Sequence, residues 1–125
     1  INIEQTLTQN NEVKQNIDET KIKELYFEKL EKSNNESQEK LADFRVDDVK
    51  ILSENEKKVL LESDIGANYK ETDILAYVEY SIQPRDINNT IWLAGNGIIE
   101  KDWLVGKIAC VCIRDGKIVS DGTSW

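Results

Sequence analysis

Three tryptophans, Trp92, Trp103 and Trp125, are the side chains of this sequence best suited to hold a ligand. A tryptophan exposed near a turn can stack on a sugar or anchor a protein partner, because its ring is large and rigid. Two glycines separate the first pair, and a hairpin there would bring Trp92 and Trp103 together as a cross-strand pair. We predict Trp92 and Trp103 as binding residues. Tryptophans more often fill a core, and that alternative stays open for all three.

The sequence offers little for acid–base or metal chemistry. It contains no histidine, which is the usual acid–base group near neutral pH and the commonest metal ligand. Cys110 and Cys112 lie two residues apart in an apolar, β-like run, so their side chains share one face and cannot easily reach each other. We expect buried free thiols, no metal site and no cofactor, because a zinc site needs further ligands at a recognisable spacing.

Acidic side chains are concentrated in the first half of the chain. They form two groups: Asp43, Asp47 and Asp48, followed by Glu54, Glu56, Glu62 and Asp64. Neither group has the ligand pattern and turn glycine of a calcium loop, so a solvated face is expected, with attraction to a basic partner as a secondary role. The formal net charge of −8 repels phosphate backbones and anionic lipids, which excludes nucleic-acid binding.

The length of 125 residues corresponds to about one domain, and no apolar run approaches the roughly 18–20 residues that a transmembrane helix needs. Residues 1–16 are polar and lack spaced apolar positions, so we expect a flexible tether followed by a single domain over residues 17–125. Because the sequence begins at Ile1 and contains no methionine, we expect an exported chain that has lost a signal or lipid-anchor segment. Ordinary trimming is the alternative.

The elements that would position these residues can be read from the apolar spacing. Asp18 can cap a helix over residues 19–32, whose buried stripe would be Ile22, Leu25, Tyr26 and Leu30. This helix is expected to end before Ser33, and a short further helical piece is expected over residues 36–41. Residues 54–62 suit a helix or a strand. Strands are predicted over residues 44–52, with a bulge at Asp47-Asp48, and over residues 73–82, 90–94, 103–114 and 117–120, the last two joined by an Asp115-Gly116 hairpin. The order predicts an α+β fold, with the N-terminal helix packed on a curved antiparallel sheet.

The last third of the chain carries a family resemblance. The motifs are Tyr77-Val-Glu-Tyr-Ser-Ile-Gln-Pro84, Trp92-Leu-Ala-Gly-Asn-Gly97, Trp103 and Asp121-Gly-Thr-Ser-Trp125. They resemble uncharacterised secreted or lipoprotein domains of low-GC Gram-positive bacteria, which look like members of the cystatin-like or NTF2-like folds. The resemblance implies an exported protein and supplies no activity. In proton-shifting NTF2-like enzymes a carboxylate and a hydroxyl meet at the mouth of a cone, for which this chain offers Asp73, Glu79 or Asp86 with Tyr77 or Tyr80. An outward charged face is the competing interpretation.

Three functions remain open on these observations. The first is a non-catalytic extracellular or cell-surface domain that binds a protein or a cell-envelope component. The second is a small NTF2-like enzyme or ligand carrier, which needs a pocket of roughly 300 Å³ between helix and sheet. The third is an acidic inhibitor that masks a basic partner, with salt-sensitive binding. The first is our main prediction, and a catalytic role is the less favoured one.

Overall fold

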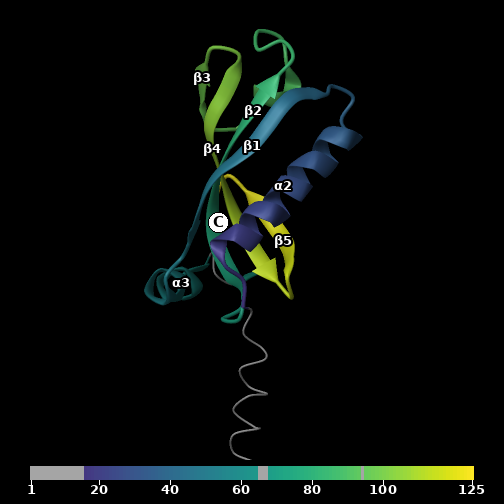
Figure 1. Ribbon diagram of the computed structural model, residues 1–125. Helices are drawn as coiled ribbons and strands as arrows, with labels where there is room; N and C mark the ends of the chain where they lie inside the picture. The colour runs from purple at the N-terminus through teal and green to yellow at the C-terminus, as the bar shows by residue number, and fades with distance from the viewer. Residues whose placement is uncertain (1–15, 65–67, 94) are drawn as a thin grey trace, which may run out of the picture.

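The computed structural model describes residues 16–64, 68–93 and 95–125. Its fold is α+β, as predicted: one long helix packs across a curved antiparallel sheet of five strands (Figure 1). The predicted tether lies outside the described residues, apart from Asn16. In chain order the elements are α2 (Glu19–Glu36), β1 (Leu41–Ile51), α3 (Glu54–Leu61), β2 (Ile74–Pro84), the 3-10 helix η2 (Ile91–Leu93), β3 (Ile98–Glu100), β4 (Trp103–Arg114) and β5 (Lys117–Gly122).

Strand β4 is the centre of the sheet. It pairs with β2 along one edge, and its other edge is shared by β3 near the start of β4 and by β5 near its end. The run over residues 108–113 is apolar on both faces, which is typical of a strand that is central or covered on both sides. The β4–β5 reversal is the predicted hairpin, since Asp115 and Gly116 have φ angles of 54° and 75°, and a type I′ turn requires both to be positive.

Helix α2 begins as its sequence predicts. The Asp18 carboxylate caps the first turn by accepting a hydrogen bond from the backbone N–H of Lys21 at 2.9 Å. The spaced apolar residues then bury one face of the helix against the sheet, where Ile22, Tyr26 and Leu30 are at most 6% exposed. The predicted stripe is therefore the main contact between helix and sheet.

The end of α2 differs from the prediction. The helix continues past Ser33 to Glu36, and the helical piece predicted over residues 36–41 is wrong, since β1 begins at Leu41. The ammonium group of Lys40 donates to three backbone carbonyls at the helix end, at distances of 2.6–3.1 Å. These bonds satisfy carbonyls that a helix terminus leaves unpaired, so the cap outweighs the low helix propensity of the Ser-Asn-Asn segment.

The strand predicted over residues 90–94 is also wrong, because residues 91–93 form η2 and residue 94 lies outside the described part. The Thr90 hydroxyl accepts a bond from the backbone N–H of Trp92 at 3.1 Å and donates to the Glu39 carboxylate. The Trp92 indole N–H donates to the Glu39 carbonyl oxygen at 2.9 Å. These contacts attach the segment to the loop before β1 instead of to a neighbouring strand.

The sheet has one face covered by α2 and one that is partly open. Ala76, Val78 and Val111 point toward α2 and form the main core. On the other face, Leu75 and Cys112 lie under a smaller cover, to which Leu60, Tyr69, Tyr77 and Trp125 contribute. From Leu75 to Val78 the side chains of β2 therefore alternate between the two faces. Leu60 belongs to α3, which is a helix because Ser53 and Glu56 form a capping box at its start. The predicted bulge in β1 is confirmed by the register shift between Val46 and Asp48.

The outer edge of β4 has a gap between β3 and β5, and the side chain of Asn96 fills it. Asn96 Oδ1 accepts a hydrogen bond from the backbone N–H of Ile108 at 2.7 Å, and Asn96 Nδ2 donates to the Ile108 carbonyl oxygen at 3.1 Å. Two such bonds to one residue are what a neighbouring antiparallel strand would supply. The side-chain amide of Asn96 thus takes the place of a strand residue.

Replacing Asn96 with alanine is expected to lower the free energy of unfolding by about 1–2 kcal/mol, because both backbone groups of Ile108 lose their partner. Amide hydrogen exchange followed by NMR should show faster exchange at Ile108. The control is Asn88→Ala, because Asn88 is exposed and its side chain makes no such pair. Unchanged exchange at Ile108 in Asn96→Ala would contradict the role given to the side chain.

Candidate functional site

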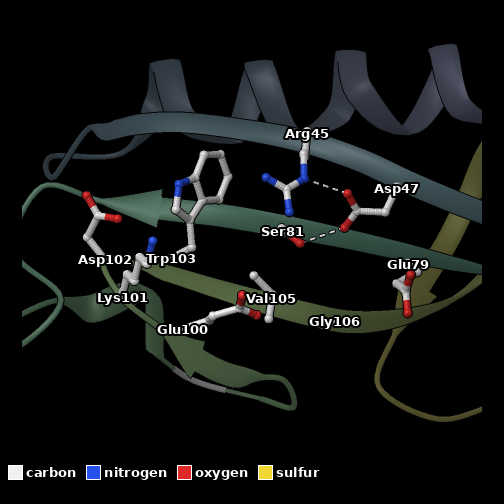
Figure 2. A pocket seen from close by; sticks show the side chains of 10 residues that line it. All are labelled: Arg45, Asp47, Glu79, Ser81, Glu100, Lys101, Asp102, Trp103, Val105 and Gly106. Carbon is white, nitrogen blue, oxygen red and sulfur yellow. Dashed lines mark hydrogen bonds and ion pairs between the residues drawn. The ribbon is translucent and has the colours of Figure 1, made fainter.

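Polar side chains line a groove on the partly open face of the sheet. Figure 2 shows them in front of the strands, with a helix behind the sheet. The groove has a volume of about 600 Å³, and its lining residues are Arg45, Asp47, Glu79, Ser81, Glu100, Lys101, Asp102, Trp103, Val105 and Gly106. They come from β1, β2, β4 and the ends of β3 and its turn, so segments far apart in the sequence meet here.

A fixed group of side chains forms the middle of the groove. Arg45 Nε donates to Asp47 Oδ1 at 2.6 Å, and the buried Ser81 hydroxyl donates to Asp47 Oδ2 at 2.6 Å (Figure 2). The guanidinium carbon of Arg45 lies 4.5 Å from the centre of the Trp103 ring, a distance at which cation and ring attract each other. Both oxygens of Asp47 are thus engaged, and the half-buried Trp103 is held from one side.

The structure places the two predicted binding tryptophans differently. Trp103 lines the groove, but Trp92 packs beside Leu41, Ile82 and Leu104 on the face that α2 covers. The predicted cross-strand pair is wrong, because Trp92 lies in η2 instead of a strand. Trp92 is half-buried and its indole N–H is bonded to backbone, so its contacts are those of a packing residue.

Trp125 also packs against the fold. Its ring lies edge-on to Tyr69 and Tyr77, with ring centres 5.9 and 5.5 Å apart. Its indole N–H donates to the Tyr77 hydroxyl at 3.1 Å. The three rings cover the smaller core around Leu75 and Cys112, so Trp103 is the tryptophan that lines the groove on this face.

Carboxylates and a glycine complete the groove. Asp102 accepts a bond from the Gln83 amide at 2.6 Å, whereas the carboxylates of Glu79 and Glu100 have no hydrogen-bond or ion-pair partner among the residues that the structure describes. Gly106 has a φ of +69°, and apart from its chain neighbours a Cβ there would meet no described atom within 4 Å. A glycine inside a strand often marks a bulge or a place where another group approaches the backbone.

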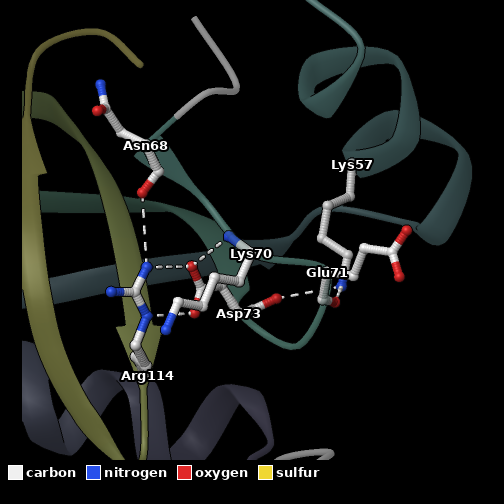
Figure 3. Close-up of polar contacts among 6 residues, drawn as sticks. All are labelled: Lys57, Asn68, Lys70, Glu71, Asp73 and Arg114. Carbon is white, nitrogen blue, oxygen red and sulfur yellow. Dashed lines mark hydrogen bonds and ion pairs between the residues drawn. The ribbon is translucent and has the colours of Figure 1, made fainter.

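Asp73, one of the carboxylates suggested by the NTF2-like resemblance, has a structural role. It is fully buried, and Arg114 binds it through Nε at 2.7 Å and through Nη2 at 2.6 Å (Figure 3). The backbone N–H of Lys70 donates to the same carboxylate at 2.8 Å. Burial by itself raises the pKa of Asp73, but the hydrogen bonds from Arg114 and Lys70 outweigh it and hold the pKa below its usual value. The carboxylate therefore stays charged and joins the loop before β2 to β4.

The other residues of that suggested set do not converge. Asp86 binds the backbone N–H of Asn88 in an exposed turn, and Tyr77 contacts Trp125. Tyr80 lies on the face opposite Glu79, against Tyr26, with ring centres 5.1 Å apart. Burial, followed by the neighbouring Tyr80, raises the pKa of Tyr26 far above that of a free tyrosine, so this pair is part of the core.

A smaller pocket lies between α2 and the sheet. Its volume is about 240 Å³, and Tyr80, Trp92, Lys107 and Asp121 are among its lining residues. Burial lowers the pKa of Lys107. The carboxylate of Asp121 is exposed, and it forms an ion pair with Lys29 at 3.3 Å. The volume is below the roughly 300 Å³ typical of ligand pockets.

Among the described residues, the thiols and the acidic side chains form no candidate metal centre. Cys110 and Cys112 are free and buried, as predicted. Burial, with the neighbouring Asp73, raises the pKa of Cys112 to about 12, so the thiol remains protonated. Within the described ranges, no three or more cysteine, aspartate or glutamate side chains are grouped so that they could hold a metal ion. No helix in these ranges is long and apolar enough to cross a membrane.

Sequence reasoning missed several groove residues, namely Arg45, Ser81, Glu100, Lys101 and Gly106. One signal was present: Arg45 and Asp47 lie two residues apart in a predicted strand, so they share a face. Ser81 and Gly106 join them only through the β1–β2–β4 pairing.

No protein-family model, curated protein or solved structure matches this chain.

Proposed function

We propose that this chain is a non-catalytic binding domain that engages a partner through the groove around Trp103. The observation that carries the proposal is the position of Trp103: its half-buried ring lines a groove of about 600 Å³ and is held by Arg45. A rigid aromatic side chain surrounded by polar groups is a typical anchor for a partner, because little entropy is lost when it is covered.

The distribution of altered pKa values supports binding over catalysis. Catalytic groups are usually found where burial and charged neighbours shift pKa values within a cleft. Here the shifted groups lie away from the groove: Asp73 and Cys112 are in structural contacts, and Tyr26, Tyr80 and Lys107 line the smaller pocket beside α2. The groove instead offers an aromatic ring and fixed polar groups. An enzyme or ligand carrier that uses the smaller pocket beside α2 stays an alternative prediction.

The proposal includes an extracellular or cell-surface location and a protein or cell-envelope component as partner. Both follow from the resemblance of the Tyr77–Pro84 and Asp121–Trp125 motifs to secreted and lipoprotein domains. A cystatin-like or NTF2-like arrangement of helix and sheet belongs to the same proposal. The mixture of carboxylates, Arg45 and Trp103 in the groove suits a polar partner with one surface that can lie on an aromatic ring.

Binding through the groove is expected to depend on Trp103. The protein would be tested on arrays of cell-envelope glycans and of peptides, and each ligand found would then be titrated by calorimetry. Trp103→Ala should weaken binding at least about tenfold, as loss of an interface anchor does. Trp92→Phe is the control, because Trp92 lies on the other face. A ligand that binds Trp103→Ala as well as the unchanged protein would show that the groove is not its site.

A further inference from the structure

The charges of the groove are unequal and point to the kind of partner it fits. Four carboxylates line it, those of Asp47, Glu79, Glu100 and Asp102, against two cationic side chains, those of Arg45 and Lys101. We infer that the groove takes a lysine- or arginine-bearing segment of a partner protein. This inference rests on the proposed function and names the chemistry of the partner.

The contacts within the groove show which carboxylates would receive the incoming cation. Arg45 is paired with Asp47, whose second oxygen is taken by Ser81, and Asp102 binds the Gln83 amide. Glu79 and Glu100 have no such partner among the described residues. They are therefore the two carboxylates of the groove with both oxygens available, so a basic side chain can reach either of them without displacing an existing contact.

The space between these carboxylates is open. Figure 2 shows Glu100 beside Val105, and Glu79 farther along the strands on the other side of Gly106. Because Gly106 has no side chain and, apart from its chain neighbours, nothing described lies within 4 Å of where a Cβ would be, an aliphatic stem can lie against the backbone there. A lysine or arginine stem prefers such a surface while its charged end reaches a carboxylate.

The arrangement of Trp103 favours a basic segment over a sugar. A sugar is usually held by stacking on an indole face, and the Arg45 guanidinium already covers one face of the Trp103 ring, 4.5 Å from its centre, so a sugar has at most one ring face left. The paired Arg45 contributes little net positive charge toward a second cation, because Asp47 is bonded to it at 2.6 Å. The overall charge of −8 also attracts a basic partner over longer distances.

The test uses a dye-labelled peptide of alternating lysine and glycine, with fluorescence anisotropy measured at low and at physiological ionic strength. The unchanged protein should bind it saturably and more weakly in salt. Glu79→Gln with Glu100→Gln should weaken binding about tenfold, from two lost ion pairs. The matched control is Glu31→Gln with Glu36→Gln, which removes the same charge from exposed positions on α2. Circular dichroism would verify that both variants fold.

Each other outcome overturns the inference. Absence of saturable peptide binding does so, and so does equal weakening by both double variants, which would mean that net charge alone attracts the peptide. If an envelope oligosaccharide binds in a Trp103-dependent manner and Glu79→Gln with Glu100→Gln leaves it unaffected, the basic segment is wrong and the proposed groove stands. If ligands bind but none depends on Trp103, the proposed groove itself fails.

Discussion

Replacing Asp73 with asparagine is expected to lower the free energy of unfolding by about 3 kcal/mol. The carboxylate is fully buried and accepts two bonds from Arg114 and one from the Lys70 backbone (Figure 3). Removing one partner of a buried ion pair leaves the other without compensation, at a cost of about 3–5 kcal/mol. Arg114 is partly exposed, which favours the lower end. Urea denaturation followed by circular dichroism measures the change.

The control for this prediction is Asp64→Asn, at an exposed position, where a change below about 0.5 kcal/mol is expected. The pH dependence gives a second check. Because the pKa of Asp73 is lowered in the folded state, its contribution is present above the unfolded pKa of about 3.9 and is lost as the pH falls through the folded value. The unchanged protein should therefore lose more stability on acidification than Asp73→Asn. Equal slopes would contradict the role given to the ion pair.

Replacing Ile22 with alanine should lower the free energy of unfolding by about 3 kcal/mol. Ile22 is completely buried between α2 and the sheet, and truncating such a residue removes apolar burial and leaves a cavity. Val59→Ala on α3 is the control, since Val59 is 71% exposed, and a change below about 0.5 kcal/mol is expected there. Urea midpoints that fall equally in the two variants would show that α2 does not depend on this contact.

Local signals allowed much of the fold to be predicted from the sequence. The Asp18 cap, the apolar stripe of α2 and the Asp115-Gly116 turn act over a few residues, so their sequence patterns suffice. The prediction of a strand over residues 90–94 is wrong because the contacts that decide the conformation of this segment are distant in the sequence. Its conformation depends on Glu39, more than fifty residues earlier, and no local pattern carries that contact.

The groove was only partly predictable. Trp103 could be singled out by its residue type, but its neighbours Arg45 and Ser81 belong to other strands. Their meeting depends on the register of β1 on β2, which pairs Arg45 with Ser81 and shifts at the following bulge. A shift by one residue would send these side chains to opposite faces. A single sequence predicts such a bulge without fixing which side chains it brings together.

The Asn96 bridge bears on how this protein ages. Asparagine followed by glycine, as in Asn96-Gly97, is prone to deamidation, in which the next backbone nitrogen attacks the side-chain carbonyl, ammonia leaves, and water then opens the cyclic imide to aspartate or isoaspartate. Here both ends of the amide are held by Ile108, so the reaction should proceed only when this bridge opens. The aspartate product would place an oxygen against the Ile108 carbonyl, where Nδ2 now donates. A one-dalton mass increase at this position would therefore mark a molecule whose sheet edge has opened at least once, and the repulsion would keep the edge from closing fully again.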